Sequence, residues 1–205
     1  MRLISAIMGR GISPLVALIC WLPYGYITVH GNPADTEIFS DTRKFLQQLD
    51  DIYLVGLTGE PGQTYPNHPY RCIKAKYGPP YDRQFRRHLR FMGNDVNDEW
   101  DNKEVYIGLS VDETRKKLDI VDMGFLLEGA PGKTPPQDNF DVVYASTECL
   151  IIGKRPYRNG RHVCTLWARK NVVASLPQGC IFPLRDNCYN AYIFPQPLRT
   201  SCSSY

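Results

Sequence analysis

The spacing of hydrophobic residues changes along the first part of the chain. After Pro33, hydrophobic and small side chains recur every three or four positions, which is typical of an amphipathic helix. These positions are Ile38, Phe39, Thr42, Phe45, Leu46 and Leu49. From Ile52 onward the chain is rich in residues that favour strands, and the segment Ile52 to Thr58 ends at Gly59. The pattern therefore predicts one helix followed directly by a first strand.

Strand-like segments continue at short intervals to residue 170. They are residues 70–77, 84–91, 104–111, 117–123, a weaker one at 125–127, 140–152 and 163–170. Turn-forming residues separate them, including Gly78-Pro79-Pro80 and the pair Asn159-Gly160, which predicts a hairpin between the last two strands. Eight short strands predict a closed antiparallel barrel or a sandwich, and the pattern does not separate the two. A barrel of this size leaves room inside for one small ligand.

The N-terminal segment has the pattern of a secretory signal peptide. Arg2 and Arg10 precede an apolar run from Ile12 to Trp21, and this run is shorter than the roughly 20 residues that span a membrane. We expect residues 1–31 to form the signal, with cleavage between positions 25 and 34, and residues 32–205 to form one secreted, extracellular domain. A retained amphipathic anchor is the alternative.

Charge and cysteine content both change once this signal is removed. Loss of Arg2 and Arg10, with no acidic residue, lowers the formal net charge from +3 to +1, which does not suit a nucleic-acid-binding domain. Six cysteines remain, and an even number in an exported chain predicts three disulfides, with 15 conceivable pairings. They are Cys72, Cys149, Cys164, Cys180, Cys188 and Cys202. Three of them lie after Val172, in a proline-rich tail that we expect to hold one short helix against the surface.

Catalytic and metal-binding motifs are absent from the sequence. The chain has no G-x-S-x-G, H-E-x-x-H or phosphate-binding glycine loop, so an enzyme is the least supported class. The four histidines are scattered without carboxylates or cysteines at ligand spacing, and the cysteines lack the C-x₂-C pairs of zinc sites. We therefore expect no catalytic residue, metal or cofactor.

Two sets of motifs resemble a known family. In the C-terminal third they are Tyr144, Glu148-Cys149-Leu150-Ile151, Cys164-Thr165-Leu166-Trp167, Pro177 and Cys180, and in the helix Asp41-Thr42-Arg43-Lys44-Phe45-Leu46 leading to Ile52-Tyr53-Leu54. In order and spacing they resemble the tick salivary lipocalins of the histamine-binding-protein family, over residues 35–202. The resemblance implies a mostly β fold, an eight-stranded antiparallel lipocalin barrel with an N-terminal helix and a short C-terminal helix. It also implies the disulfides Cys149–Cys180 and Cys72–Cys202, which leaves Cys164 with Cys188.

The same resemblance implies a ligand site inside the barrel. In the family, amine capture rests on an Asp after the first cysteine and a Glu before Leu-Trp, but here these positions are Leu150 and Thr165, and the helical Trp is Arg43. An unpaired buried ammonium costs several kcal/mol, so the substitutions favour an apolar or amphipathic mediator, such as a fatty acid, sterol or eicosanoid, over histamine or serotonin. The site residues carried over are Asp41, Arg43, Tyr144, Glu148, Leu150, Thr165 and Trp167.

Simpler roles remain open for several of these residues. Strand alternation places Thr165 with Trp167 on one face, and Leu150 with Tyr144 and Glu148 on one face. Glu148 either restores a carboxylate inside the barrel or lies exposed at its rim. Arg43 meets a ligand carboxylate at the mouth or, as the more common case, is a solvated helix charge. Trp167 is a core residue of the wall in either case.

A basic cluster offers a second kind of partner. It comprises Arg83, Arg86, Arg87, His88 and Arg90, and alternation places Arg87 on the face opposite Arg86 and Arg90. A solvated surface is the default interpretation, and a glycosaminoglycan or an acidic host protein is the alternative. Two functions follow: a monomeric lipocalin that sequesters a small host mediator to evade host defence, or a protein-binding immune or haemostatic modulator that uses the barrel as a scaffold.

Overall fold

The structure is a computed structural model that describes residues 33–58, 70–94, 100–123, 137–154 and 158–202. The chain divides into two compact units, residues 1–31 and 32–205, and only the second contains described residues. The predicted signal peptide and the weak strand at 125–127 lie outside the described residues. Within the described part of the chain, no helix has the length and apolar character that crossing a membrane requires.

The predicted helix is confirmed as α1, Pro33–Leu46. Its buried side chains, Phe39, Phe45 and Leu46, recur at the helical period, because only one side of the helix packs against the strands. The prediction extended to Leu49, but this residue lies beyond the helix and its exposed fraction is 72%. Residues 47–51 instead form the connection from α1 to the first strand.

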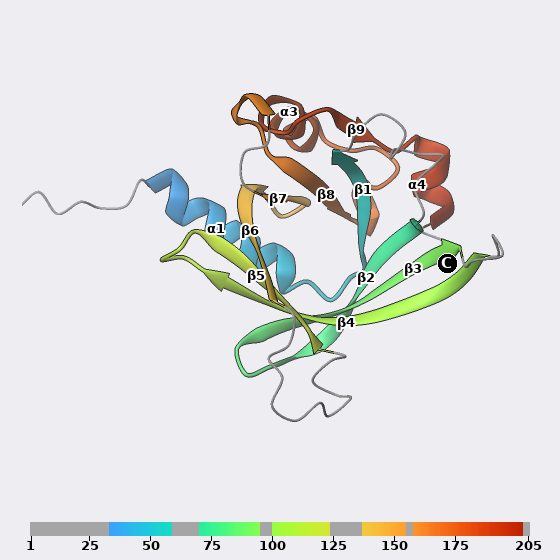
Figure 1. Cartoon of the computed structure of the whole chain (residues 1–205), viewed down its shortest axis with the longest axis horizontal. Helices are drawn as coiled ribbons and strands as arrows, with labels where there is room; N and C mark the ends of the chain where they lie inside the picture. The colour runs from blue at the N-terminus through green and yellow to red at the C-terminus, as the bar shows by residue number, and fades with distance from the viewer. Residues whose placement is uncertain (1–32, 59–69, 95–99, 124–136, 155–157, 203–205) are drawn as a thin grey trace, which may run out of the picture. The chain divides into compact units, whose positions relative to one another are not determined.

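Eight antiparallel strands form a closed barrel, as the family resemblance implies and the strand pattern left open (Figure 1). They are β1 Ile52–Thr58, β2 Tyr70–Tyr81, β3 Gln84–Asn94, β4 Trp100–Asp112, β5 Lys117–Asp122, β6 Gln137–Ala145, β7 Cys149–Lys154 and β8 Val163–Arg169. Each strand pairs with the next, and β1 closes the ring by pairing with both β8 and β2.

The ring closes through a short contact between β1 and β2. Ile52 and Tyr53 are the β1 residues that pair with β2, whereas Gly56 to Thr58 pair with a short extra strand, β9 Ala191–Ile193. Gly56 allows β9 to approach β1 in place of β2, because a Cβ atom at position 56 would lie 3.0 Å from the carbonyl oxygen of Tyr192. The two ends of β1 therefore have different partners.

The predicted strand at residues 140–152 is wrong, because the chain turns within it. Ser146 Oγ accepts hydrogen bonds from the backbone N–H groups of Glu148 and Cys149, at 3.2 Å each, and the Ser146 N–H donates to the Cys149 carbonyl at 2.9 Å. These bonds form a tight turn between β6 and β7. The predicted segment thus forms two strands, β6 and β7, which complete the eight strands of the barrel.

The predicted turns have mixed outcomes. The turn at Gly78-Pro79-Pro80 is wrong, since β2 continues to Tyr81 with a register shift that accommodates the prolines. The chain reverses instead at Asp82 and Arg83, whose φ angles of 45° and 64° suit a two-residue hairpin. The connection at Asn159-Gly160 is confirmed: both residues have positive φ, and they lie in η2, Arg158–Gly160, between β7 and β8.

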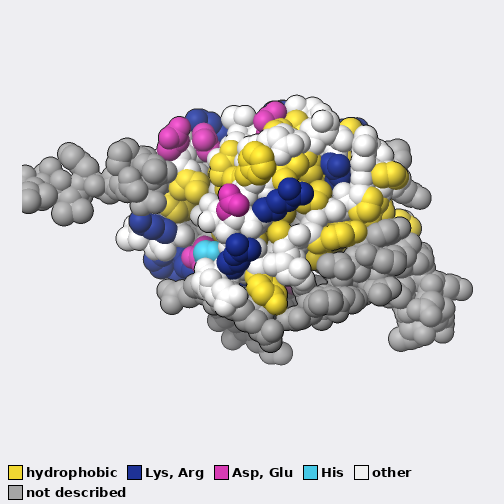
Figure 2. Space-filling model, turned by 90° about the horizontal axis from the view of Figure 1, so that it is seen from above, with side chains coloured by type: hydrophobic (Ala, Val, Ile, Leu, Met, Phe, Trp, Pro, Cys, Tyr) yellow, Lys and Arg dark blue, Asp and Glu magenta, His cyan; other side chains and the backbone are white. Residues whose placement is uncertain are grey.

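The C-terminal segment covers the outside of the barrel over β1, β7 and β8 (Figure 1). It contains η3 Lys170–Val172, α3 Gln178–Asn187, β9 and α4 Gln196–Cys202, so it has two α-helices where the sequence predicted one. Buried side chains such as Ile151, Leu166 and Leu184 form a cluster between α3 and the barrel wall. Figure 2 shows the molecule from above, where basic and acidic side chains are interspersed among hydrophobic ones.

Three disulfides hold this covering segment in place, and their pairing is the one that the resemblance implies. Cys149–Cys180 joins β7 to α3, Cys164–Cys188 joins β8 to the end of α3, and Cys72–Cys202 joins β2 to α4. In the chain-entropy model, a longer closed loop restricts the unfolded chain more. The bond that spans 130 residues therefore contributes the most by this effect.

Replacement of both Cys72 and Cys202 by Ala is expected to lower the free energy of unfolding by about 4–5 kcal/mol, because the unfolded chain regains the freedom of the 130-residue loop. Urea unfolding, with the other two disulfides verified as intact, measures this change. A loss below about 1 kcal/mol would show that the bond does not restrain the unfolded chain.

Candidate functional site

A small apolar cavity lies inside the barrel. It has a volume of about 90 Å³, and the atoms at its surface are apolar. Inward-pointing residues of the strands supply most of the wall, and Leu46 at the end of α1 contributes from the helix. The lining residues are Leu46, Ile52, Ala75, Arg87, Leu89, Ile107, Leu109, Leu118, Ile120, Leu150, Ile152 and Trp167.

Leu150, Thr165 and Trp167 come together in the barrel wall. Leu150 is 2% exposed and pairs across the strands with Trp167, and both line the cavity. Thr165 lies two residues before Trp167 on the same face of β8, and its Oγ1 accepts a hydrogen bond of 3.0 Å from the indole Nε1. Because the indole N–H is satisfied within its own strand, Trp167 presents an apolar ring to the interior.

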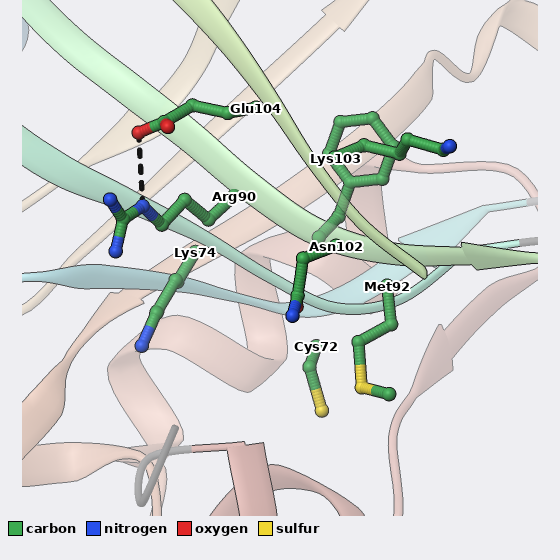
Figure 3. Close-up of a pocket in the computed structure, with 8 residues that line it drawn as sticks. Cys72, Lys74, Arg90, Met92, Asn102, Lys103 and Glu104 are labelled. Carbon is green, nitrogen blue, oxygen red and sulfur yellow. Dashed lines mark hydrogen bonds and ion pairs between the residues drawn. The ribbon is translucent and has the colours of Figure 1, made fainter. Parts of the chain in front are cut away.

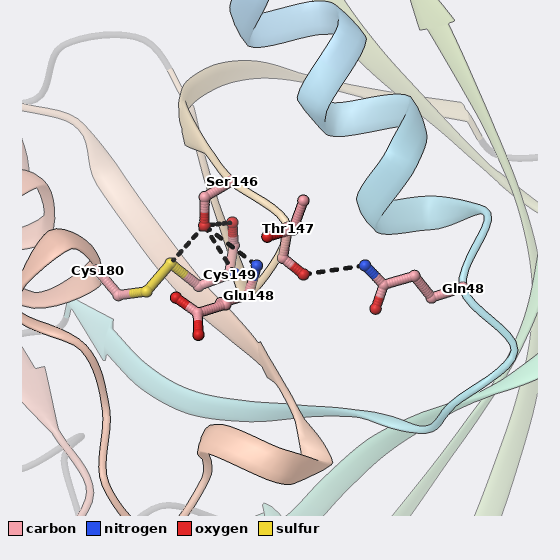
Figure 4. Close-up of a disulfide and its surroundings, with 6 residues drawn as sticks. All are labelled: Gln48, Ser146, Thr147, Glu148, Cys149 and Cys180. Carbon is pink, nitrogen blue, oxygen red and sulfur yellow. Dashed lines mark hydrogen bonds between the residues drawn. A yellow bond between two sulfur atoms is a disulfide. The ribbon is translucent and has the colours of Figure 1, made fainter.

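Tyr144 does not share a face with Leu150, so that part of the prediction is wrong, and Glu148 does not line the cavity. A register shift in β6 pairs Tyr144 with Ile151, and both pack in the cluster beneath α3, outside the barrel. Glu148 lies in the turn before β7, next to the Cys149–Cys180 disulfide (Figure 4). The prediction extended the alternation of one strand across a turn that the structure places at residues 146–148.

Asp41 and Arg43 lie on the outer surface of α1. Asp41 forms an ion pair of 2.9 Å with Lys44, and Arg43 forms one of 2.9 Å with Glu113, in the connection between β4 and β5. Neither residue lines the cavity. The structure thus places Arg43 in a surface ion pair.

Arg87 belongs to the interior and not to a surface patch, which corrects its assignment to a protein- or glycan-binding cluster. Its side chain is 1% exposed, and its guanidinium donates three hydrogen bonds to the connection between α1 and β1. Nη1 donates to the carbonyl of Asp50 at 3.0 Å, and Nη2 to those of Leu46 and Gln48 at 3.0 and 2.6 Å. Burial lowers the pKa of Arg87 to about 10, while the nearby carboxylate of Asp51 opposes this change.

The sequence contains a pattern that predicts the inward position of Arg87, although its basic neighbours suggest a surface cluster. Arg87 alternates in phase with Phe85 and Leu89, both of which pack in the interior cluster. An arginine that continues an apolar face along a strand is an inward residue, and it then needs buried acceptors. The identity of those acceptors was not predictable, because they lie 37 to 41 residues away in the sequence.

Among the described residues that line the cavity, there is no carboxylate that could hold a ligand cation. Asp122 pairs with the inward Ile107 and continues the inward face of β5, but it is not one of these lining residues. Asp119 is 5% exposed, but it alternates with the inward Leu118 and Ile120, and its Oδ2 accepts a hydrogen bond of 2.6 Å from Arg115. Among the described residues, no group of three or more His, Cys, Asp or Glu side chains is placed to hold a metal ion.

Solved structures resemble the chain in fold. Japanin from Rhipicephalus appendiculatus, in a crystal form bound to cholesterol, gives a TM-score of 0.54 at 14% identity, covering 72% of this chain and 93% of that chain. Lobster apocrustacyanin A1 gives 0.45 at 12% identity, covering 79% and 85%. A scan against protein-family models and a search of the curated proteins found no match. The similarity to Japanin, together with the barrel topology, shows that the chain has the lipocalin fold.

Replacement of Arg87 by Met keeps most of the apolar stem but leaves three carbonyl groups, one of them in a fully buried hydrogen bond, without their donor. We expect the free energy of unfolding to fall by about 2–3 kcal/mol, as measured by urea unfolding. Arg86→Met, at the neighbouring outward position, serves as the control and should change stability by less than about 1 kcal/mol. Equal losses in the two variants would contradict the assigned role of Arg87.

Proposed function

We propose that the chain is a secreted lipocalin that captures one small apolar or amphipathic molecule inside its barrel and holds it without turnover. The lipocalin fold supports a binding function, and three disulfides are typical of proteins that mature in an oxidising compartment. We assign residues 1–31 to the signal peptide. The motifs shared with tick salivary lipocalins, and the likeness in fold to Japanin, support capture of a host mediator by a protein that evades host defence.

The apolar cavity wall is the observation that carries this proposal. Two wall positions, Leu150 and Thr165, stand where the amine-binding motif has acids, and Leu150 lines the cavity. A protonated amine placed there would lose its water without gaining a partner, which costs several kcal/mol. A hydrocarbon or sterol ring system has no hydrogen bonds to water to give up when it enters, so an apolar cavity is a favourable site for it. Fatty acids, sterols and eicosanoids therefore rank ahead of histamine and serotonin.

The volume of the cavity limits how such a ligand binds. A cavity of about 150 Å³ takes up a single benzene molecule, so 90 Å³ holds only a small part of a lipid. Entry of a whole ligand thus requires the flexible side chains of the wall to change rotamer and enlarge the space. Leucine and isoleucine side chains such as Leu118 and Ile120 line this space.

The small volume also favours a second candidate function. A barrel whose interior stays closed would act as a scaffold, and the protein would then bind a host protein as an immune or haemostatic modulator. The two candidates differ in one measurable respect, because only the first requires ligand to reach the side chain of Trp167.

Replacement of Ala75 by Leu provides the test of ligand capture. Ala75 is 2% exposed and lines the cavity, so three added carbon atoms fill space that a ligand would use. The probes are arachidonate and cholesterol. We expect each bound ligand to quench the fluorescence of Trp167, and native mass spectrometry to show one ligand per protein molecule. The variant should bind at least about tenfold more weakly.

The matched control is Ala174→Leu, the same substitution at an exposed position outside the barrel, which should leave the affinity unchanged. Trp167→Phe should abolish the part of the fluorescence change that comes from the cavity, and so identifies it. Histamine binding that is stronger than arachidonate binding would overturn the assigned ligand class. Absence of binding for all probes would favour the scaffold function.

A further inference from the structure

The outer face of β2, β3 and β4 carries an excess of positive charge. Because Ala75, Leu89 and Ile107 point into the barrel, the residues that alternate with them point outward. Strand register aligns these outward residues in three rows across the strands. The rows are Lys74–Arg90–Glu104, Lys76–His88–Tyr106 and Gly78–Arg86–Gly108. They contain four lysine or arginine side chains and a single carboxylate, and we call them the basic face.

A hollow of about 320 Å³ lies at one end of the basic face. Figure 3 shows Lys74 and Arg90 next to each other in its wall, with Glu104 bound to Arg90 through an ion pair of 2.9 Å. Cys72, at the edge of the hollow, bonds to Cys202, so the disulfide to α4 fixes this region of β2. The hollow thus combines cationic walls with a covalently restrained frame.

Lys74 is held among like charges in this hollow. It is 5% exposed, and burial followed by the positive charge of Lys76 lowers its pKa, while Asp51 opposes the change. Arg90 and Lys170 add further repulsion. An anionic group bound in the hollow would offset this repulsion, because it would face several cations at once.

Aromatic contacts position Arg86 and His88 on the basic face. The guanidinium of Arg86 lies 4.4 Å from the ring centre of Tyr81, and the ring of His88 lies 4.3 Å from that of Tyr106. These contacts restrict the side chains before a ligand arrives, which lowers the entropy cost of binding. Arg86 and Arg90 lie four residues apart on β3, a separation of about 13 Å.

We propose that the basic face binds a sulfated polysaccharide, with one sulfate group in the hollow beside Lys74 and Arg90. A span of about 13 Å suits a polymer with repeated anionic groups better than a single small anion. Arginine forms paired hydrogen bonds to oxyanions such as sulfate. Three disulfides indicate a protein of the secretory route, where sulfated glycans are the abundant polyanions.

The basic face differs from the cluster that the sequence suggests. Arg87 is absent from it because that side chain lies inside the barrel, and Arg83 lies in the turn between β2 and β3. Lys74 and Lys76 join it from β2, through pairing with Arg90 and His88. Its charge therefore comes from two strands, which a search for consecutive basic residues does not detect.

The test uses the disulfide-bonded protein with heparin as the probe and fully desulfated heparin as the matched glycan. We expect heparin binding that weakens steeply as salt rises, with little binding to the desulfated form. The triple variant Lys76→Ala, Arg86→Ala, Arg90→Ala should bind heparin at least about tenfold more weakly, with a smaller salt dependence.

A charge-matched control separates the basic face from net charge. Lys154→Ala, Arg161→Ala, Arg185→Ala removes the same charge from exposed positions on β7, the β7–β8 connection and α3, and it should retain heparin affinity. Equal weakening in both triple variants, or binding to desulfated heparin as strong as to heparin, would overturn the proposal. So would tighter binding to single-stranded DNA or to phosphatidylserine vesicles. Ala75→Leu should leave heparin binding unchanged, since it alters only the barrel interior.

Discussion

The buried guanidinium of Arg87 organises the part of the barrel where α1 leads into β1. It joins β3 to three carbonyl groups of the α1–β1 connection, and no other fully buried side chain of the described residues is larger. Two further contacts hold the same connection: Gln48 donates to the carbonyl of Thr147 at 2.9 Å, and Arg169 donates to the carboxylate of Asp50 at 2.8 Å. The connection is therefore tied to β3, to the β6–β7 turn and to β8, which positions α1 and its Leu46 against the cavity. A buried cation that donates to three backbone carbonyls tolerates little displacement, so these bonds fix the position of the connection relative to β3.

The strands of the barrel separate three environments by alternation alone. Inward residues form the apolar cavity, while outward residues of β7, β8 and β1 pack beneath the C-terminal segment. Outward residues of β2 to β4 form the basic face. Because successive side chains of a strand point to opposite faces, an apolar interior and a charged exterior coexist in a segment such as β3 without conflict. The disulfides follow the same division, since Cys149 and Cys164 lie on the outward side and bond to the covering segment.

The ligand class depends on which charges the interior lacks as much as on its shape. In the proposed function, Leu150 and Thr165 stand where the amine-binding motif of the resembled family has acids, and the buried carboxylate of Asp119 on β5 points outward toward Arg115. Among the described residues, Arg87 is the one charged residue that lines the cavity, yet its hydrogen bonds direct the guanidinium to backbone carbonyls and leave apolar atoms at the cavity surface. The interior is thus suited to hydrocarbon, and positive charge is concentrated outside on a separate face. The two proposed sites, one for a small molecule and one for a polyanion, therefore lie on opposite faces of the barrel wall.

The sequence by itself determined the elements that depend on local interactions. Periodicity predicted α1 and the strand Ile52–Thr58 at its observed limits, turn chemistry predicted the hairpin at Asn159-Gly160, and alternation placed Thr165 and Trp167 on one face. The disulfide pairing came from the family resemblance. Tertiary structure alone decided the positions of Tyr144 and Glu148, because one register shift and one turn reverse the alternation on which their prediction rested. It also decided the partners of Arg87 and the volume of the cavity. Those features arise from contacts between segments distant in the chain, for which neither spacing nor composition carries a signal.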